Sequence, residues 1–379
     1  MPDELDLRER SSGTWWEVDE EFATVPLDAV QQVCLAGLER AGAQPQDAQF
    51  VFNSYLDKTL QGDHARGIAR IPGLVREALR GDVNLRPSPQ ILREKGATAL
   101  VKGARHDLPR LVCKYGMELA VQKARVHGVG WVGAQAPGEV LGAYVKIAVS
   151  SGMVGFATTQ SYALVAPTGG YQPLLGNGPF AFGIPAGGHD PVILDMSTTH
   201  TSASGVFLAA RQGQQVPEGM VFDAKGNPTT NAADFPDPDA LSRGRQAARG
   251  SLVPLGNSPK SYALIFVLGL LTSVLTDSSA PWDVGNKSGP GEGRSGTILA
   301  AIDPTAFLAS QEVGKRVDGY IDKVKASAKR PGVREILYPG EGSQRLQRER
   351  RQAGQIAIPA SQYQALAALA SELGLKGWL

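Results

Sequence analysis

Short apolar segments alternate with amphipathic helical segments between residues 98 and 196, and this alternation constrains the fold more than any other feature. Residues 109–126 carry apolar side chains at helical spacing, with Val112, Tyr115 and Leu119 on one face. The same patterns predict strands at residues 98–101, 129–132, 153–158, 192–196 and 297–302 and helices at 143–151 and 261–276. Such an order predicts an α/β fold in which helices cover a sheet.

Helical patterns flank this region on both sides. Helices are expected at residues 26–41, 71–79, 316–329 and 362–373. A further helix is expected to begin at Asp47, which would cap it. Residues 166–188 are expected to form a loop. The predicted organisation is a polar extension at 1–22, a helical part at 23–97, a central α/β domain at 98–300 with a polar surface excursion at 213–257, and a helical part at 301–379 that packs on residues 23–97.

The segment Gly128-Val-Gly-Trp-Val-Gly133 matches the GxGxxG dinucleotide-binding pattern in letters only. In that fingerprint the glycines follow a strand and open a helix, so that the helix N-terminus meets the pyrophosphate. Here a long helical pattern precedes the glycines and a strand contains them. We therefore interpret the segment as a turn between a helix and a strand.

Composition excludes several classes of protein. Lys plus Arg total 38 and Asp plus Glu total 37 in 379 residues, a net charge of +1 that argues against a nucleic-acid partner. No zinc-binding motif occurs, and the two cysteines, Cys34 and Cys113, are expected to be free and buried. The apolar run at 263–275 is shorter than the ~20 residues of a membrane span and is expected to be a buried helix. The chain is thus expected to be cytoplasmic, with neither membrane nor metal.

Glycine-rich loops and a polar strand end mark one candidate pocket. The strand at 192–196 ends in Asp195-Met-Ser-Thr198, and Gly176-Asn-Gly178 lies in a preceding loop. Ligands of α/β folds bind at the carboxyl ends of strands, and glycines let the backbone approach a ligand closely. These segments predict a phosphate or carboxylate pocket, with ordinary tight loops as the alternative.

Taken together, several segments resemble the type-2 malate/L-lactate dehydrogenase family, which includes sulfolactate dehydrogenases and Δ1-piperideine-2-carboxylate reductases. The resemblance spans roughly residues 25–377. Its carriers are Gly67-Ile-Ala-Arg-Ile-Pro72, Met117-Glu-Leu-Ala120, Ala166-Pro-Thr-Gly-Gly170, Leu175-Gly-Asn-Gly-Pro179, Ile193-Leu-Asp-Met196, Pro217-Glu-Gly219, Gly226-Asn-Pro-Thr-Thr230, Pro254-Leu-Gly256, Lys260 and Pro339-Gly-Glu341.

This resemblance implies a non-Rossmann malate/lactate dehydrogenase-like fold, NADPH or NADH as cofactor, a small carboxylate-bearing substrate and a homodimer. The positions expected to bind the cofactor are Thr158, Thr159, Gly176, Asn177, Gly178, Asp195, Met196, Ser197, Thr198 and Lys260.

The sequence departs from the family's Ser-His-Gly-x-x-Arg motif. Ala65 and Arg66 stand in place of the Ser and His, while Gly67 and Arg70 match. Arg70 is expected to clamp the substrate carboxylate, because a guanidinium fork fits a carboxylate. Arg66 cannot donate a proton near neutral pH and is either an anion clamp or a surface residue. His64, two residues earlier, is a substitute proton donor or an exposed loop histidine.

A second family histidine is missing as well. The family carries Asn-Ser-x-His-x-Gly after the strand at 129–132, whereas this chain reads Ala134-Gln-Ala-Pro-Gly-Glu139. Glu139 is the nearest titratable residue, as a new acid or base or as a plain loop carboxylate.

Loss of both histidines shifts the expected reaction. Reducing a 2-oxo acid needs a proton on the carbonyl oxygen, whereas a cyclic imine can arrive protonated. The sequence therefore predicts an NAD(P)H-dependent reductase of a small carboxylate-bearing cyclic imine or 2-oxo acid. The alternatives are an isomerase, cyclase or lyase on the same carboxylate pocket, and a protein that only binds.

Overall fold

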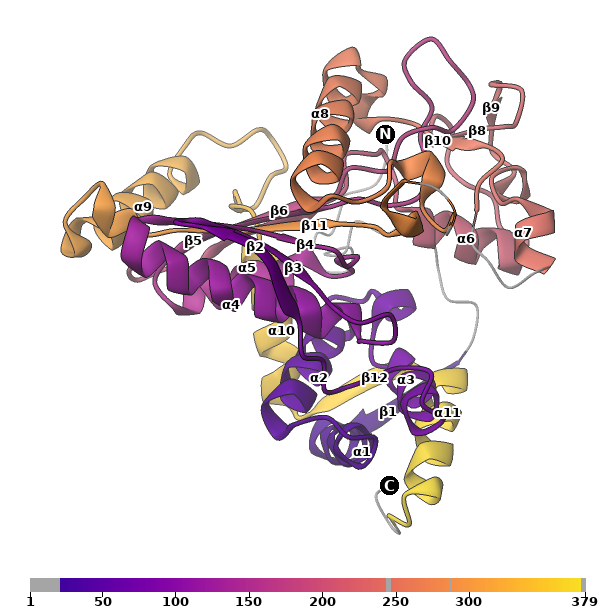
Figure 1. Ribbon diagram of the computed structural model, residues 1–379, viewed down its shortest axis with the longest axis horizontal. Coiled ribbons are helices and arrows are strands. Elements are labelled where there is room, and N and C mark those ends of the chain that lie inside the picture. Colours follow the sequence, from indigo (N-terminus) through magenta and orange to yellow (C-terminus); the bar gives the residue numbers. More distant parts are fainter. Residues whose placement is uncertain (1–20, 243–246, 287, 289, 376–379) are drawn as a thin grey trace.

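The computed structural model describes residues 21–375 except 243–246, 287 and 289. Nearly all of the predicted polar extension, residues 1–20, lies outside the described residues. The described residues form three groups of elements: a seven-stranded sheet with its helices, a helical unit made from both ends of the chain, and a smaller unit that follows β7 (Figure 1).

The sheet has the strand order β2-β3-β4-β11-β5-β6-β7 and is almost entirely antiparallel. Its strands are β2 (Gln90–Lys95), β3 (Thr98–Lys102), β4 (Val129–Ala134), β11 (Thr297–Ile302), β5 (Val154–Thr159), β6 (Phe180–Ile184) and β7 (Val192–Met196). Only β3 and β4 pair in parallel. A dinucleotide-binding Rossmann sheet is mostly parallel, so this is a different α/β fold.

Helices α4 (Pro109–His127) and α5 (Leu141–Ser150) cover one face of this sheet. Gly128 ends α4 in the left-handed conformation (φ 78°), and Gly130 lies against the helix. A Cβ on Gly130 would lie 1.9 Å from the Ala120 carbonyl oxygen. Gly128 and Gly130 therefore serve the turn and the packing between α4 and β4, in agreement with the interpretation from the sequence. A Cβ on Gly133 would instead lie 2.4 Å from the Leu275 carbonyl oxygen of α8.

Helix α8 (Pro259–Thr276) lies on the opposite face of the sheet, and the prediction that it is buried is wrong (Figure 1). Only Ile265, Leu268, Thr272 and Thr276 are buried, while Val267, Leu270 and Val274 are 55–67 % exposed. Within the described residues α8 alone is long and apolar enough to cross a membrane, judged by length and composition.

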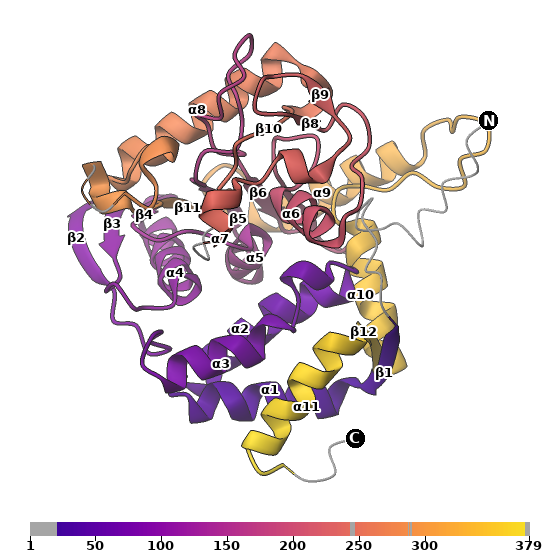
Figure 2. The ribbon, with the colours of Figure 1, turned by 90° about the vertical axis from the view of Figure 1, so that its right-hand side faces the viewer.

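The first helices and the end of the chain form one helical unit, seen below the sheet in Figure 2. It contains β1 (Phe22–Pro26), α1 (Leu27–Arg40), α2 (Pro45–Leu60), the 3-10 turn η1 (His64–Arg66), α3 (Arg70–Leu79), α10 (Glu341–Ala353), β12 (Gln355–Pro359) and α11 (Ala360–Glu372). Strand β1 pairs antiparallel with β12. Ile356, Ile358, Leu366 and Leu369 enter the same apolar core as α1–α3.

The segment at 213–257 is more than a polar surface excursion. With α6 (Ala203–Gln212) it forms a unit that contains β8 (Val221–Phe222), β9 (Pro228–Thr229), η2 (Ala232–Asp234), α7 (Pro238–Ser242), β10 (Ser251–Leu252) and η3 (Leu255–Asn257). Val216, Phe235 and Leu252 are buried in its core. This core could not be predicted from the sequence, because the apolar residues that form it are isolated between polar turns.

Several predicted boundaries need correction. Strand β2, expected within the helical part, joins the sheet, and β6 lies inside the stretch expected to be loop. The α2 helix is preceded by Gln44 rather than capped by Asp47. The remaining elements are η4 (Pro281–Asp283), η5 (Pro290–Gly293), η6 (Pro304–Ala306) and α9 (Ser310–Lys325).

Helix α9 begins at Ser310, earlier than the helix expected at 316–329, and its last residue, Lys325, forms an ion pair with Glu341 at the start of α10. It lies beside the loop after β6, because Asp318 accepts hydrogen bonds from the amides of Gly187 and Gly188 at 3.0 and 2.7 Å. Cys34 and Cys113 are free and buried, as expected.

Candidate active site

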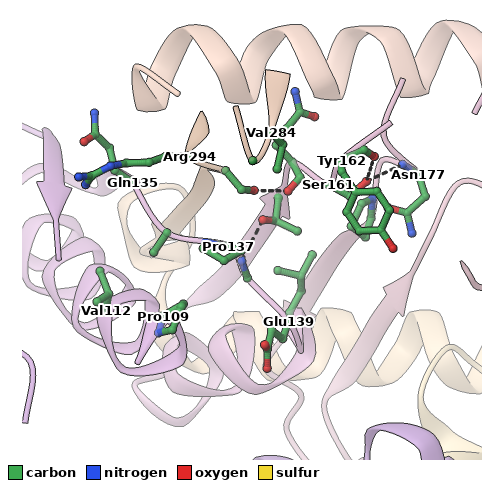
Figure 3. Close-up of a pocket in the computed structure, with 18 of the residues that line it drawn as sticks. Pro109, Val112, Gln135, Pro137, Glu139, Ser161, Tyr162, Asn177, Val284 and Arg294 are labelled. Carbon is green, nitrogen blue, oxygen red and sulfur yellow. Dashed lines mark hydrogen bonds between the residues drawn. The ribbon is translucent and has the colours of Figure 1, made fainter. Parts of the chain in front are cut away.

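One large cleft, of about 970 Å³, opens where the three units meet. Figure 3 shows Gln135 and Arg294 at one end and Ser161, Tyr162 and Asn177 at the other. The helical unit contributes Lys58 and Arg66, and β7 contributes Asp195, Met196 and Ser197. Polar groups from separate parts of the sequence thus converge on one cavity at strand ends, where α/β proteins bind ligands.

Asp195 carries the charge at the end of β7. Its Oδ2 atom lies 3.1 Å from Lys58 Nζ, and the two side chains are 22 % and 12 % exposed. Burial raises the pKa of the Asp195 carboxyl, but Lys58, Arg66 and the Gly142 amide lower it, and the net shift is downward. A Cβ on Gly142 would come within 3.0 Å of Asp195 Oδ2, so this glycine lets α5 begin against the carboxylate.

Arg66 lines the cleft, whereas the two neighbouring residues predicted to act there do not. Its Nε and Nη2 both contact Asp63 Oδ2, at 2.7 and 2.6 Å, and that carboxylate is buried. Arg70 is exposed at the start of α3 and donates from Nε to the Ala65 carbonyl. His64 packs edge-on against Phe22, with ring centroids 5.3 Å apart, outside the cleft lining.

Glu139 also lines the cleft and is bound from behind by a buried arginine. Arg110 Nη2 donates to Glu139 Oε2 at 2.6 Å, and its Nη1 donates to Ser54 Oγ. The Arg110 guanidinium lies 3.8 Å over the ring of Tyr55. The Arg110 side chain is 2 % exposed and that of Glu139 is 44 % exposed. Through its contacts with Ser54 and Tyr55, Arg110 links α2 of the helical unit to Glu139 in the cleft wall.

The predicted cofactor loop splits into residues that face the cleft and residues that support it. Thr159, Asn177, Met196 and Ser197 line the cleft. Thr198 is buried and donates from Oγ1 to the carbonyls of Asn177 and Gly178, which fixes the loop to the strand end.

Glycine is required in this loop because of close packing. At Gly178 φ is +48°, and a Cβ would lie 2.7 Å from Thr198 Oγ1. A Cβ on Gly176 would lie 2.7 Å from Ser161 Oγ. Thr158 is buried and donates a hydrogen bond to the Pro179 carbonyl, so it supports the loop and does not line the cleft. Lys260 is exposed near the start of α8 and does not line the cleft.

Sequence reasoning missed several residues that do line it. These are Lys58, Arg105, Gln135, Ser161, Tyr162, Ser202, Ser204 and Arg294. Lys58 lies on an amphipathic helix, where a lysine is usually solvated. Ser202 had a local signal, because it precedes a helical pattern and caps α6 by accepting a hydrogen bond from the Gly205 amide.

The lining fits a nicotinamide dinucleotide. The N-terminus of the ten-residue helix α6 faces the cleft with Ser202 and Ser204, and helix N-termini bind phosphate groups. Asn177, Ser161 and Ser197 add further polar groups to the lining. Among the described residues, no group of three or more His, Cys, Asp or Glu could hold a metal ion.

Known proteins share this sequence and architecture over almost the whole chain. The malate/L-lactate dehydrogenase family model matches residues 25–367. A malate/(S)-sulfolactate dehydrogenase from Methanothermus fervidus is 30 % identical, over 89 % of this chain and 95 % of that protein. A Δ1-pyrroline-2-carboxylate/Δ1-piperideine-2-carboxylate reductase from Pseudomonas putida is 30 % identical over 74 % of this chain and 80 % of its own.

A solved structure of a sulfolactate dehydrogenase has the same fold as this chain. Sulfolactate dehydrogenase from Methanocaldococcus jannaschii superposes with a TM-score of 0.77 and 29 % identity, covering 93 % of this chain and 98 % of that one. The fold predicted from the resemblance is thereby confirmed. The chain belongs to the malate/L-lactate dehydrogenase family of NAD(P)-dependent oxidoreductases.

Proposed function

We propose that this protein uses NADPH or NADH to reduce a small carboxylate-bearing cyclic imine or 2-oxo acid. The observation that carries the proposal is the cleft itself, where the Asp195–Ser197 strand end, Asn177 and the α6 N-terminus face two cations of the helical unit. The bound cofactor supplies the hydride. The protein's residues orient the two reactants and manage charge and protons.

Arg66 is the better candidate for the substrate carboxylate. It lines the cleft, while Arg70 is exposed outside it. Asp63 fixes one edge of the Arg66 guanidinium and leaves Nη1 without a contact to that carboxylate. A guanidinium held in one orientation loses less freedom when it binds a planar carboxylate.

Two features favour the imine within this substrate class. Glu139 and Asp195 place carboxylates along the cleft, and an iminium cation is stabilised by carboxylates where a neutral ketone is not. In addition, one relative is a reductase of Δ1-pyrroline-2-carboxylate and Δ1-piperideine-2-carboxylate by its name. Malate and sulfolactate relatives keep the 2-oxo acid as the other candidate.

We further propose a cytoplasmic homodimer. Helix α8 lies over one face of the sheet (Figure 1), and its side chains Val267, Leu270 and Val274 are exposed. On that sheet face the rings of Trp131, Phe156 and Phe182 follow one another, with centroids 5.9 and 4.8 Å apart. A second copy that covers both surfaces would remove this apolar area from water.

The test combines cofactor binding with product mass. Fluorescence titration with NADPH and NADH should give saturable binding below millimolar concentration. Δ1-Piperideine-2-carboxylate and oxaloacetate, supplied separately, should yield a product heavier by two hydrogens. Binding of neither cofactor would refute the proposal, and a product isomeric with its substrate would favour the isomerase alternative.

A further inference from the structure

Lys58 brings an ammonium group into the cleft from the last turn of α2. Its side chain is 12 % exposed, and its contact with Asp195 Oδ2 crosses from the helical unit to the sheet. A buried lysine that bridges two units is commonly structural, but this one also lines the cavity proposed to hold the substrate. The group is therefore both fixed in position and accessible from the cleft.

Asp195 is suited to orient this ammonium group and not to give up a proton itself. The Gly142 amide and Lys58 both donate to it, and Arg66 adds a positive charge nearby. These groups favour the ionised carboxylate, which only accepts hydrogen bonds. Within the pair, the protons available for transfer are on Lys58 Nζ.

The other titratable groups on the cleft lining are less suited to the task. Asp107 accepts hydrogen bonds from the Ala104 amide and from Asn84, and Glu292 forms an ion pair with Arg294. Arg66, Arg105 and Arg294 are guanidinium groups that do not deprotonate in proteins. Glu139 is held by the buried guanidinium of Arg110. Tyr162, whose pKa burial raises to about 12, lies beside Ser161 and Asn177 at the far end of the cleft from Gln135 (Figure 3).

We infer that Lys58 is the catalytic proton donor of this cleft and takes the place of the histidines that the sequence lacks. This inference rests on the proposed reductase function. As a hydride from the dihydronicotinamide adds to the carbonyl or imine carbon, the π electron pair moves to oxygen or nitrogen. A proton from Lys58 Nζ completes the new O–H bond, or the new N–H bond where the imine binds in its unprotonated form. The substrate gains two electrons, the dihydronicotinamide is oxidised, and the neutral amine recovers a proton from solvent.

Three variants separate proton donation from a structural role. Lys58→Arg keeps a cation beside Asp195 but removes a proton that can be transferred, and Lys58→Ala removes the group. Lys146→Ala is the matched control, since Lys146 Nζ lies 2.6 Å from Asp57 Oδ2 and lines a smaller cavity behind the pair, outside the main cleft. Each protein is assayed with oxaloacetate and NADH or NADPH, and its cofactor affinity is measured by titration.

We expect kcat for oxaloacetate to fall by about 10²–10⁴-fold in Lys58→Arg and Lys58→Ala, the usual contribution of general acid catalysis. Cofactor affinity should stay unchanged in Lys58→Arg and in the control. Added ethylammonium should restore part of the rate of Lys58→Ala, because a small cation can occupy the space and donate a proton. Full kcat in Lys58→Arg, or no rescue of Lys58→Ala, would overturn the inference.

A second measurement does not require turnover of a substrate. Reductive methylation with ¹³C-formaldehyde labels lysines, and comparison with Lys58→Arg identifies the Lys58 signal. Oxamate, an unreactive isostere of a 2-oxo acid, should shift that signal in the presence of cofactor. An unmoved signal in a protein that binds cofactor would overturn the role of Lys58 alone, whereas failure to bind cofactor would overturn the proposed function.

Discussion

Individual side chains in the cleft gain their roles from the partners that fix them. Arg66 and Arg70 are four residues apart, yet one lines the cavity and the other is exposed, since Arg66 ends the turn η1 and Arg70 begins α3. Asp63 holds the first, and the Ala65 carbonyl holds the second. The residue type alone therefore does not identify the carboxylate clamp.

Substitution of the two arginines distinguishes them. Arg66→Ala should raise KM for the carboxylate substrate by about 10- to 100-fold, because a charged hydrogen bond contributes about 1.5–3 kcal/mol. Arg66→Lys should recover part of that loss, since it keeps the charge without the fork. Steady-state kinetics on Arg70→Ala completes the comparison: a larger effect there than at Arg66 would return the clamp to the position expected from the sequence.

The lowered pKa of Asp195 predicts how stability depends on acid. A carboxyl whose pKa is lower in the folded state contributes stability that is fully present above its unfolded pKa of about 3.9. That contribution is lost as pH falls through the folded pKa. Urea unfolding of the wild type and of Asp195→Asn, from pH 6 downward, should give stabilities that converge as pH falls below about 4. A constant difference would contradict the ion pair with Lys58.

At the scale of elements, the sheet and its helices fit through positions where only glycine leaves room. Gly130→Ala should lower the free energy of unfolding by about 1–3 kcal/mol, the usual effect of overpacking, because its Cβ would press α4 away from β4. Gly73→Ala is the control: it lies within α3 with nothing within 4 Å of the added Cβ. Thermal unfolding should show that Gly73→Ala gains about 0.5–1 kcal/mol.

Some of these helices and strands could be predicted from the sequence, and others could not. Strands β7 and β11 and helix α4 were predictable because their apolar patterns are continuous and bounded by turns. Strand β2 was missed because all six of its residues are exposed at the sheet edge, which removes any alternation. Strand β6 was missed because it is short and lies among glycines and prolines.

Some of the residues in and around the cleft could likewise be predicted from the sequence, and others could not. Asp195, Asn177 and Ser197 were predictable, since strand-end and glycine-loop patterns mark them. Lys58 and Arg110 were not, because their roles depend on how the helical unit lies against the sheet. His64 and Arg70 were expected to act in the site from the resemblance to the family's motif, but neither lines the cleft: His64 begins the turn η1 and Arg70 begins α3.

At the scale of the whole molecule, the unburied face of α8 is the strongest sign of assembly. The charged variant Val267→Glu/Leu270→Glu should dissociate the proposed homodimer, because two carboxylates cannot be buried in an apolar contact. Sedimentation or light scattering should then give half the wild-type mass. Leu79→Glu, at an exposed apolar position on α3, is the matched control and should keep the dimer. A monomeric wild type would contradict the proposal.

The pairing of β1 with β12 has a consequence for how the protein is made. During synthesis, α1 to α3 leave the ribosome more than two hundred and fifty residues before the segment at 355–372 that completes their core. At about 5–20 residues per second, that delay is on the order of tens of seconds. Throughout it, apolar side chains such as Val33, Phe52 and Leu74 await their final neighbours. The core of the helical unit is therefore completed only when almost the whole chain has left the ribosome.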